Sequence, residues 1–159
     1  MNRIKKEAPV LILLNIRSTH NVGSIFRTAD AAGVSHIYLV GYTPSPVDQF
    51  GRKRKDISKV SLGAEDTIRW SSHKTLSPVI SKLKKEGRDI IGLEQHPSSK
   101  KYHQINSSKC ALILGNEVDG IDAKSIALCD TIMEIPMHGK KESLNVSVAA
   151  GIALFELIK

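Results

Sequence analysis

Apolar residues gather along the chain in short, unbroken runs. Strands covered by helices on both faces show this continuous apolarity, whereas strands with one solvent face alternate apolar and polar residues. The runs, each predicted to be a strand, are Val10–Ile16, His36–Val40, Asp89–Leu93, Cys110–Leu114 and Thr131–Ile135, with a weaker candidate at Thr67–Trp70. They predict a buried and mostly parallel sheet.

Between these runs, apolar residues recur at i, i+3, i+4 and i+7, the spacing of one helix face. Gly33 and Gly87 follow two of the patterns as helix stop signals. The patterns comprise Val22, Ile25, Phe26 and Ala29 in the first helix and Leu76, Val79, Ile80 and Leu83 in the second. Because strands and helices alternate, we predict an α/β fold with a mostly parallel sheet flanked by helices.

The last predicted helix runs from Leu144 to Ile158 and is apolar on nearly every side. A helix of this kind is buried on every side. A length of 159 residues predicts one domain, spanning 1–159. One domain offers too little protein to cover such a helix, so we expect a second copy to cover part of it in a homodimer.

The chain has a formal net charge of +7, which suits an anionic partner such as nucleic acid. A basic enzyme without such a partner fits the charge equally well. No run approaches the ~20 apolar residues of a membrane span, and the charged stretch Met1–Pro9 lacks the pattern of a signal peptide. We therefore expect a cytoplasmic protein without a membrane partner, with Cys110 and Cys129 as reduced thiols. The scattered His residues predict no metal site.

Polar residues and Gly are concentrated in three segments, 15–27, 114–120 and 135–146, each directly after a predicted strand. Ligands of open α/β sheets bind at the carboxyl ends of the strands. Each segment also has a plain structural interpretation: Asn21 or Ser143 can cap a helix, and Gly115 to Gly120 can form a turn. The chain contains neither the GxGxxG fingerprint nor a P-loop, which argues against a dehydrogenase and an NTPase.

Taken together and in order, the three segments resemble the three motifs of TrmH-like (SpoU-type) RNA 2'-O-methyltransferases of the SPOUT superfamily. The stretch 58–65 is also similar to that family. The matching motifs are Asn15…Arg17…Asn21-x-Gly23…Arg27 in the first, Gly115-Asn116-Glu117…Gly120 in the second, and Ile135-Pro136-Met137…Ser143-Leu144-Asn145-Val146-Ser147 in the third. The resemblance spans essentially the whole chain.

The resemblance implies a parallel α/β sheet with a C-terminal trefoil knot, a rare exception to ordinary topology. It also implies a homodimer and S-adenosylmethionine as the methyl donor. The cofactor-binding residues that it implies are Leu93, Gly115, Ile135, Met137, Ser143 and Leu144.

The reaction implied by the resemblance is transfer of a methyl group to a ribose 2'-hydroxyl, with Arg27 beside that hydroxyl. Because Arg stays protonated in proteins, we expect Arg27 to orient the hydroxyl and the adjoining phosphate rather than to act as a simple base. Asn21, Glu117 and Asn145 then hold Arg27, the ribose and the motif loops in place.

We expect no separate RNA-binding domain, so that the catalytic domain itself holds the RNA. Phosphate contacts position a substrate without reading its sequence. The candidate RNA contacts are Asn15, Arg17, Arg52, Lys53, Arg54, Lys55, Lys100, Lys101, Lys140 and Lys141. Any one of these cations can equally be an ordinary solvated charge.

The expected substrate is tRNA, by analogy with small relatives, and rRNA is the alternative. Two further interpretations remain open: methylation of a base nitrogen by the same fold, and an RNA-binding protein of this fold that has lost turnover. Arg27, Glu117 and Asn145 argue against the loss of turnover, because all three motif positions are retained.

Overall fold

Seven parallel strands organise the chain in the computed structural model, which describes residues 7–159. The strands are β1 (Val10–Leu14), β2 (His36–Val40), β3 (Arg69–His73), β4 (Asp89–Leu93), β5 (Lys100–Lys101), β6 (Cys110–Leu114) and β7 (Thr131–Glu134). Their order across the sheet is β3-β2-β1-β6-β4-β7-β5, and every neighbouring pair is parallel. The predicted α/β fold with a mostly parallel sheet is confirmed. Part of the charged stretch Met1–Pro9, namely residues 1–6, lies outside the described residues.

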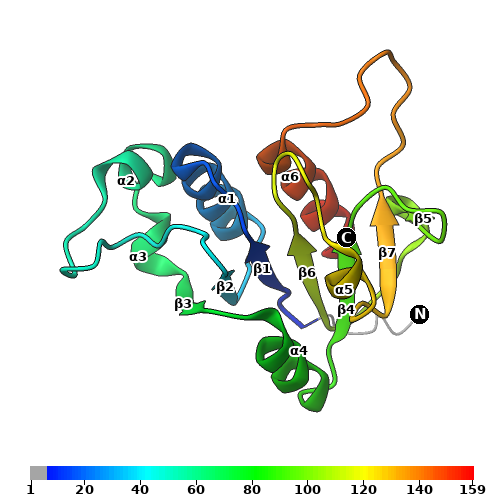
Figure 1. Cartoon of the computed structure of the whole chain (residues 1–159), viewed down its shortest axis with the longest axis horizontal. Coiled ribbons are helices and arrows are strands. Elements are labelled where there is room, and N and C mark those ends of the chain that lie inside the picture. The colour runs from blue at the N-terminus through cyan, green and yellow to red at the C-terminus, as the bar shows by residue number, and fades with distance from the viewer. Residues whose placement is uncertain (1–6) are drawn as a thin grey trace.

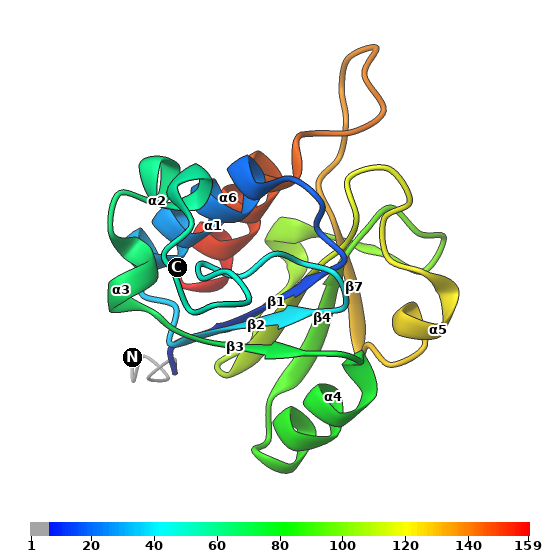
Figure 2. The same cartoon turned by 60° about the vertical axis from the view of Figure 1, so that its left-hand side comes forward.

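Helices cover both faces of the sheet, as Figures 1 and 2 show. In β1, Leu11 and Leu13 join the apolar cluster under α1 (Thr19–Ala31) and α6 (Val146–Leu157). The alternate residues of β1 join the opposite cluster, under α4 (Leu76–Lys85). Because strand side chains alternate between faces, a run that is apolar throughout must be covered twice.

Several short elements lie in segments where the sequence pattern predicts only linkers or turns. They are α2 (Lys55–Ser61), α3 (Ala64–Thr67), α5 (Ala123–Ile126), β5 and the 3-10 helix η1 (Tyr102–Gln104). Elements of two to seven residues are too short to show a hydrophobic period. Their positions were therefore not predicted.

The structure corrects several predicted boundaries. Strand β3 begins two residues later than predicted, and β1 and β7 end earlier, at Leu14 and Glu134. The N-cap of α1 is Ser18, whose hydroxyl accepts a hydrogen bond from the Asn21 backbone N–H, so Asn21 is not the cap. The N-cap of α6 is Asn145 rather than Ser143, and the helix begins at Val146 rather than Leu144.

Helix α6 is not buried on every side within one chain. One face packs on α1, with Ala150, Ala153 and Leu154 fully buried. The opposite face exposes Val148 at 52% and Phe155 at 50% of their surface. Among residues 7–159 this face is left uncovered, which is the part of the helix that the sequence predicts a second copy to cover; the homodimer stays a prediction.

The described residues yield three further findings about predicted properties. None of their helices is long and apolar enough to cross a membrane. Nor does any group of three or more His, Cys, Asp or Glu among them offer a metal site. Burial, with a smaller contribution from Asp130, raises the pKa of the Cys129 thiol to about 11, so this thiol is protonated at neutral pH.

Gly23 allows α1 to pack tightly against α2. A Cβ atom at this position would lie 2.8 Å from the Ile57 carbonyl oxygen and 3.0 Å from the Val60 Cβ. In contrast, a Cβ atom at Gly151 of α6 would meet only the Thr28 methyl group, at an ordinary 3.5 Å. The two glycines therefore respond oppositely to an added methyl group.

We expect Gly23→Ala to destabilise the fold by about 1–3 kcal/mol, because the backbone of α2 must move. Gly151→Ala should stabilise it by about 0.5–1 kcal/mol, because Ala costs less than Gly in a helix interior. Urea unfolding at one fixed protein concentration measures both. A Gly23→Ala protein as stable as wild type would show that α1 and α2 can separate without cost.

Candidate functional site

A cavity of about 850 Å³ opens at the carboxyl ends of β4 and β6. Its volume lies in the range of small-molecule sites, and its position is the usual one for a ligand of an open α/β sheet. Its lining residues are Asn21, Leu93, Glu94, Gln95, His96, Leu114, Gly115, Asn116, Glu117, Val118, Asp119, Gly120, Ile121, Ala123, Ile126, Ala127, Ser143, Leu144, Asn145, Val146 and Ala149. All three polar segments of the sequence contribute to it.

A chain of side-chain hydrogen bonds joins the three segments beside this cavity. The Asn145 amide donates to the Asn21 amide oxygen at 3.2 Å, and the Asn21 amide donates to the Glu117 carboxylate at 3.1 Å. Glu117 also accepts from the backbone N–H groups of Arg17, at 3.0 Å, and Ser18, at 3.0 Å. Residues about a hundred positions apart in sequence are thus fixed to one another.

Glu117 is held as a carboxylate by these contacts. Burial alone would raise its pKa, but the backbone N–H groups of Arg17 and Ser18 and the Asn21 amide lower the pKa below the ordinary 4.5. Hydrogen bonds to the charged form have this effect. A group that stays ionised and is occupied by loop donors is suited to holding loops rather than to exchanging protons.

Asn116 closes the loop that follows β6. Its amide oxygen accepts from the backbone N–H groups of Val118, at 2.8 Å, and Asp119, at 2.9 Å. Its amide nitrogen donates to the Asn15 carbonyl and to the Tyr42 hydroxyl, both at 2.9 Å. The loop is therefore closed on itself and tied to the end of β1.

Glycine is required at two positions of this loop. A Cβ atom at Gly115 would lie 2.5 Å from the Gly120 carbonyl carbon, so the two strands of the turn could not approach. Gly120 has a φ of +67° and a side chain there would collide with the Glu94 carboxylate. Glu94 uses that carboxylate to accept from the Ile121 N–H at 2.9 Å.

The cavity is acidic although the chain is basic. Three carboxylates line it, from Glu94, Glu117 and Asp119, and its described lining residues include no Lys or Arg. Apolar side chains such as Leu93, Leu114, Ile121 and Leu144 form much of the remaining wall. The combination suits a ligand that has a flat apolar part and a positively charged centre.

The structure brings together all six residues predicted to bind a cofactor. Four of them, Leu93, Gly115, Ser143 and Leu144, line the main cavity. The other two, Ile135 and Met137, line an adjoining hollow of about 90 Å³ that shares Leu93, Ser143 and Leu144 with the main cavity. Their role in binding stays a prediction.

Sequence reasoning missed the residues at the end of β4, Glu94 and Gln95. The Gln95 amide donates to the Glu142 carbonyl at 2.6 Å and so holds the segment between β7 and α6. Figures 1 and 2 show this segment, in orange, reaching away from the rest of the chain. The available signal was position alone, because both residues directly follow a predicted strand.

Arg27 does not reach the main cavity within one chain. It is exposed on α1 and lines a separate hollow of about 290 Å³, together with Asp30 and residues of α2, α3 and the turn between them. Of the four predicted catalytic residues, the structure therefore groups Asn21, Glu117 and Asn145 and separates Arg27 from them.

Most of the predicted RNA contacts are exposed, but several are already engaged. In the basic run, Arg52 pairs with Asp48, Lys53 with Glu65 and Asp66, and Arg54 with Asp56, while Lys55 begins α2. The amide oxygen of Asn15 accepts from the Tyr42 N–H, and Arg17 is tied to Glu117 through its backbone. The remaining candidates, exposed side chains, are Lys100, Lys101, Lys140 and Lys141.

A parallel α/β/α sheet with an acidic cavity at its strand ends defines the class of small-ligand-binding α/β domains. Within that class, a model of the SpoU rRNA Methylase family matches residues 8–155. The chain belongs to this family.

Individual relatives agree with this assignment. The 23S rRNA (guanosine-2'-O-)-methyltransferase RlmB of Neisseria meningitidis is 36% identical over 151 residues, which are 94% of this chain and 58% of that protein. The RlmB of Xylella fastidiosa is 35% identical over 153 residues, 96% of this chain and 59% of that protein. The chain thus spans less than two thirds of the length of these curated relatives.

Solved structures share the fold. An AdoMet-bound rRNA methyltransferase from Sinorhizobium meliloti superposes with a TM-score of 0.83 at 27% identity, over 97% of this chain and 57% of that one. A TrmH/SpoU tRNA modifying enzyme from A. aeolicus gives a TM-score of 0.82 at 25% identity, over 96% of this chain and 75% of that one.

We expect Glu117→Gln to show how much the charged carboxylate of Glu117 contributes to the free energy of unfolding. Because the folded-state pKa is lowered, the stabilisation by Glu117 is fully present above the ordinary value of 4.5 and is lost as the pH falls through the lowered pKa. The difference in unfolding free energy between wild type and variant should therefore shrink below pH 4.5. Denaturant unfolding across this range tests it; a pH-independent difference would contradict it.

Asn145 has two functions that two variants separate. Asn145→Ala removes the N-cap, and we expect it to cost about 1 kcal/mol. Asn145→Asp keeps an acceptor for the Ser147 N–H but loses the donor to Asn21, so it should keep most of the stability. In both variants the Asn21 side-chain amide should exchange faster with solvent by NMR. Unchanged exchange would mean that Asn145 does not hold Asn21.

Proposed function

We propose that the chain transfers a methyl group from S-adenosylmethionine to a ribose 2'-hydroxyl of RNA. The observation that carries this proposal is the acidic cavity, whose walls are the second and third motifs and whose rim is tied to the first by Asn21. The family and the activities named for its relatives support the same reaction.

The residues of the cavity fit this cofactor. Carboxylates of Glu94, Glu117 and Asp119 suit the positive sulfonium and amino groups, and the apolar wall suits the adenine ring. Gly115 and Gly120 lack side chains, so the two arms of the loop after β6 can pack closely against each other and against Glu94. When bound, the cofactor supplies an already activated methyl group, so the protein's part is to position the hydroxyl and assist its deprotonation.

In this proposal Arg27 orients the hydroxyl and the adjoining phosphate, since a guanidinium binds phosphate oxygens in a fork. Asn21, Glu117 and Asn145 hold the loops around the reacting groups. A guanidinium is a poor proton acceptor, so the hydroxyl proton leaves to another acceptor, such as the RNA phosphate.

The second protomer of the proposed homodimer would cover the exposed face of α6. Val148, Ile152 and Phe155 lie on this face, and the exposed Leu144 continues the apolar surface to the rim of the cavity. Since Arg27 of one chain lines a different hollow, a partner beside the cavity offers a way to complete the site. This arrangement supports a dimer whose sites lie near its interface.

The proposed trefoil knot has support from the strand order. β4 lies between β6 and β7, so the chain crosses β4 on its way from β6 to β7. α6 then returns from β7, near one edge of the sheet, to pack against α1. The single domain and the cytoplasmic location stay predictions.

Ribosomal RNA is the substrate that the relatives favour. The sequence alone led us to expect tRNA, with rRNA as the alternative, but the RlmB relatives are named for 23S rRNA. The TrmH/SpoU neighbour from A. aeolicus, a tRNA modifying enzyme by name, is less similar in sequence. We therefore propose rRNA as the substrate class.

Labelled methyl transfer tests the reaction directly. The protein is incubated with radiolabelled S-adenosylmethionine and unmodified RNA, fractionated into rRNA and tRNA, and the RNA is digested to nucleosides. We expect label in a 2'-O-methylnucleoside of the rRNA fraction. Label in a methylated base would replace the proposal with base methylation, and an absence of both label and cofactor binding would favour a silent RNA-binding protein.

Arg27→Lys keeps the positive charge but removes the two parallel N–H donors of the guanidinium. We expect methyl transfer to fall by about 100-fold, because small errors in position cost that much. Affinity for S-adenosylmethionine should change less than about twofold, since Arg27 lies outside the cavity. Calorimetry and single-turnover kinetics measure the two, with Lys85→Arg on α4 as the control. Near-full activity of Arg27→Lys would rule out the orienting role.

A further inference from the structure

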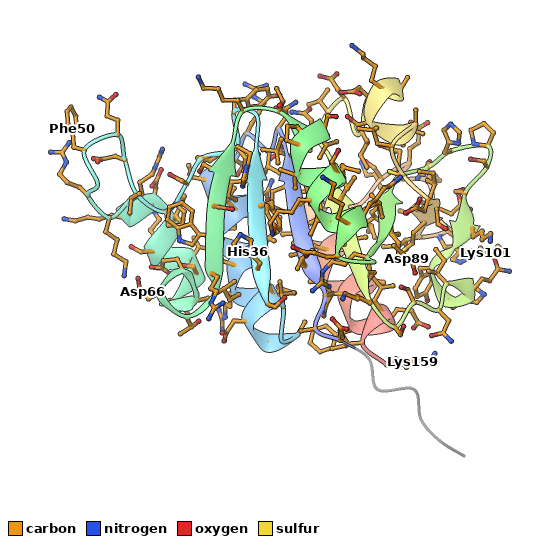
Figure 3. All side chains as sticks on the ribbon, turned by 90° about the horizontal axis from the view of Figure 1, so that it is seen from below. His36, Phe50, Asp66, Asp89, Lys101 and Lys159 are labelled. Carbon is orange, nitrogen blue, oxygen red and sulfur yellow. The ribbon has the colours of Figure 1, made fainter. Side chains whose placement is uncertain are left out.

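The segment 46–54 forms a closed loop between β2 and α2, with Phe50 near its tip. Figure 3 shows Phe50 at the end of the molecule opposite Lys101. The two arms of the loop are joined by an antiparallel bridge between Val47 and Lys53. The Arg54 N–H donates to the Pro46 carbonyl at 2.9 Å and closes the base of the loop.

Asp48 fixes the tip of this loop. One carboxylate oxygen accepts from the backbone N–H groups of Phe50, at 2.8 Å, and Arg52, at 3.0 Å, and the other accepts from the Arg52 guanidinium at 2.9 Å. The Asp48 N–H donates to the Arg52 carbonyl at 2.8 Å. Gly51, with a φ of +77°, allows the reversal of direction. Hydrogen bonds between Asp48 and Arg52 thus join the residues before and after the turn.

The side chain that this turn presents is apolar and open to solvent. Phe50 is 70% exposed, whereas Phe26 is fully buried. The Arg52 guanidinium lies 5.0 Å from the centre of the Phe50 ring. A single exposed apolar residue is common on protein surfaces. Here a hydrogen-bonded turn holds the exposed ring outward, with a guanidinium over one face.

The charged residues near Phe50 indicate which kind of partner could bind over the ring. Arg52, Lys53, Arg54 and Lys55 follow it within five residues, and ion pairs with Asp48, Asp56, Glu65 and Asp66 hold the first three of these cations in place. The guanidinium on the ring and the exposed Lys55 suit a polyanion, and base faces stack on aromatic rings. The partner that combines negative charge with flat aromatic faces is a nucleic acid.

We propose that Phe50 is a stacking platform for an unpaired base of the RNA substrate. The open face of the ring receives the base, while Arg52 packs on the other face. This inference rests on the proposed function and narrows its substrate class to RNA with an unpaired nucleotide near the methylated one. Bases within a duplex already stack on both faces, and the deep groove of A-form RNA excludes side chains.

The loop is also placed to act near the proposed catalytic arginine. Lys53 ties it to α3 through the carboxylates of Glu65, at 3.1 Å, and Asp66, at 2.8 Å. The residues at the start of α3, Gly63 and Ala64, line the hollow that contains Arg27. A base on Phe50 would therefore hold the RNA on the side of the chain where Arg27 acts.

The test compares binding of two fluorescein-labelled RNAs, a hairpin with an unpaired loop and a blunt duplex of equal length. We expect Phe50→Ala to weaken binding of the hairpin by about 5- to 100-fold, the range of one base–aromatic stack. Duplex binding should change by less than about twofold. Phe50→Leu, which stays apolar but lacks a ring, should behave like Phe50→Ala. Phe50→Trp should retain hairpin binding, and its added indole fluorescence should be quenched by the hairpin.

The outcomes separate this inference from the proposed function. If wild type methylates RNA and both Phe50→Ala and Phe50→Leu bind the hairpin as wild type does, the stacking role is wrong and the proposed function stands. Equal losses for hairpin and duplex would make Phe50 a general surface contact and also overturn the role. Changed self-association without changed RNA binding would assign the ring to a second copy instead. If wild type neither binds nor methylates either RNA, both proposals fail.

Discussion

The site depends on satisfying one buried amide, the side chain of Asn21. Only 7% of this residue is exposed, and an unpaired buried amide is costly. Asn21 meets this constraint by donating to Glu117 and accepting from Asn145. The loops after β1, β6 and β7 therefore cannot move independently without breaking a buried contact. The shape of the cavity follows from that coupling.

The positive and negative side chains lie in different parts of the molecule, which the net charge alone does not reveal. The cavity is lined by carboxylates, whereas the exposed cations lie outside it, on helices, edge strands and loops of the described chain. Several of these cations are fixed by acidic neighbours: Asp48 orders Arg52, and Glu65 and Asp66 hold Lys53. In the loop that presents Phe50, ion pairing thus shapes a rigid surface. An isolated exposed pair would add little stability, but here several contacts act on one turn.

Local chemistry explains which predictions succeeded and which failed. The five strongly apolar strands were located to within two residues because runs such as Cys110–Leu114 are apolar on both faces, and that pattern needs no tertiary context; the weaker β3 ends three residues later than predicted. The caps of α1 and α6 were misassigned because Ser18, Asn21, Ser143 and Asn145 are all chemically competent. The choice was made by Glu117 and by the packing of α6 on α1, which draw Asn21 and Asn145 into a shared contact.

The sequence by itself determined the alternation of strands and helices, the parallel sheet and the three segments at the strand ends, because each depends on periodicity or on residues close in the chain. Only the tertiary structure decided that the cavity is acidic, that Arg27 lies outside it, and that Asp48 holds Phe50 outward. The first two features depend on distances between residues of different elements, and the third depends on a turn geometry that the order of residues alone does not specify. Sequence order does not specify such distances, because many packings share the same local pattern and the buried contacts choose among them.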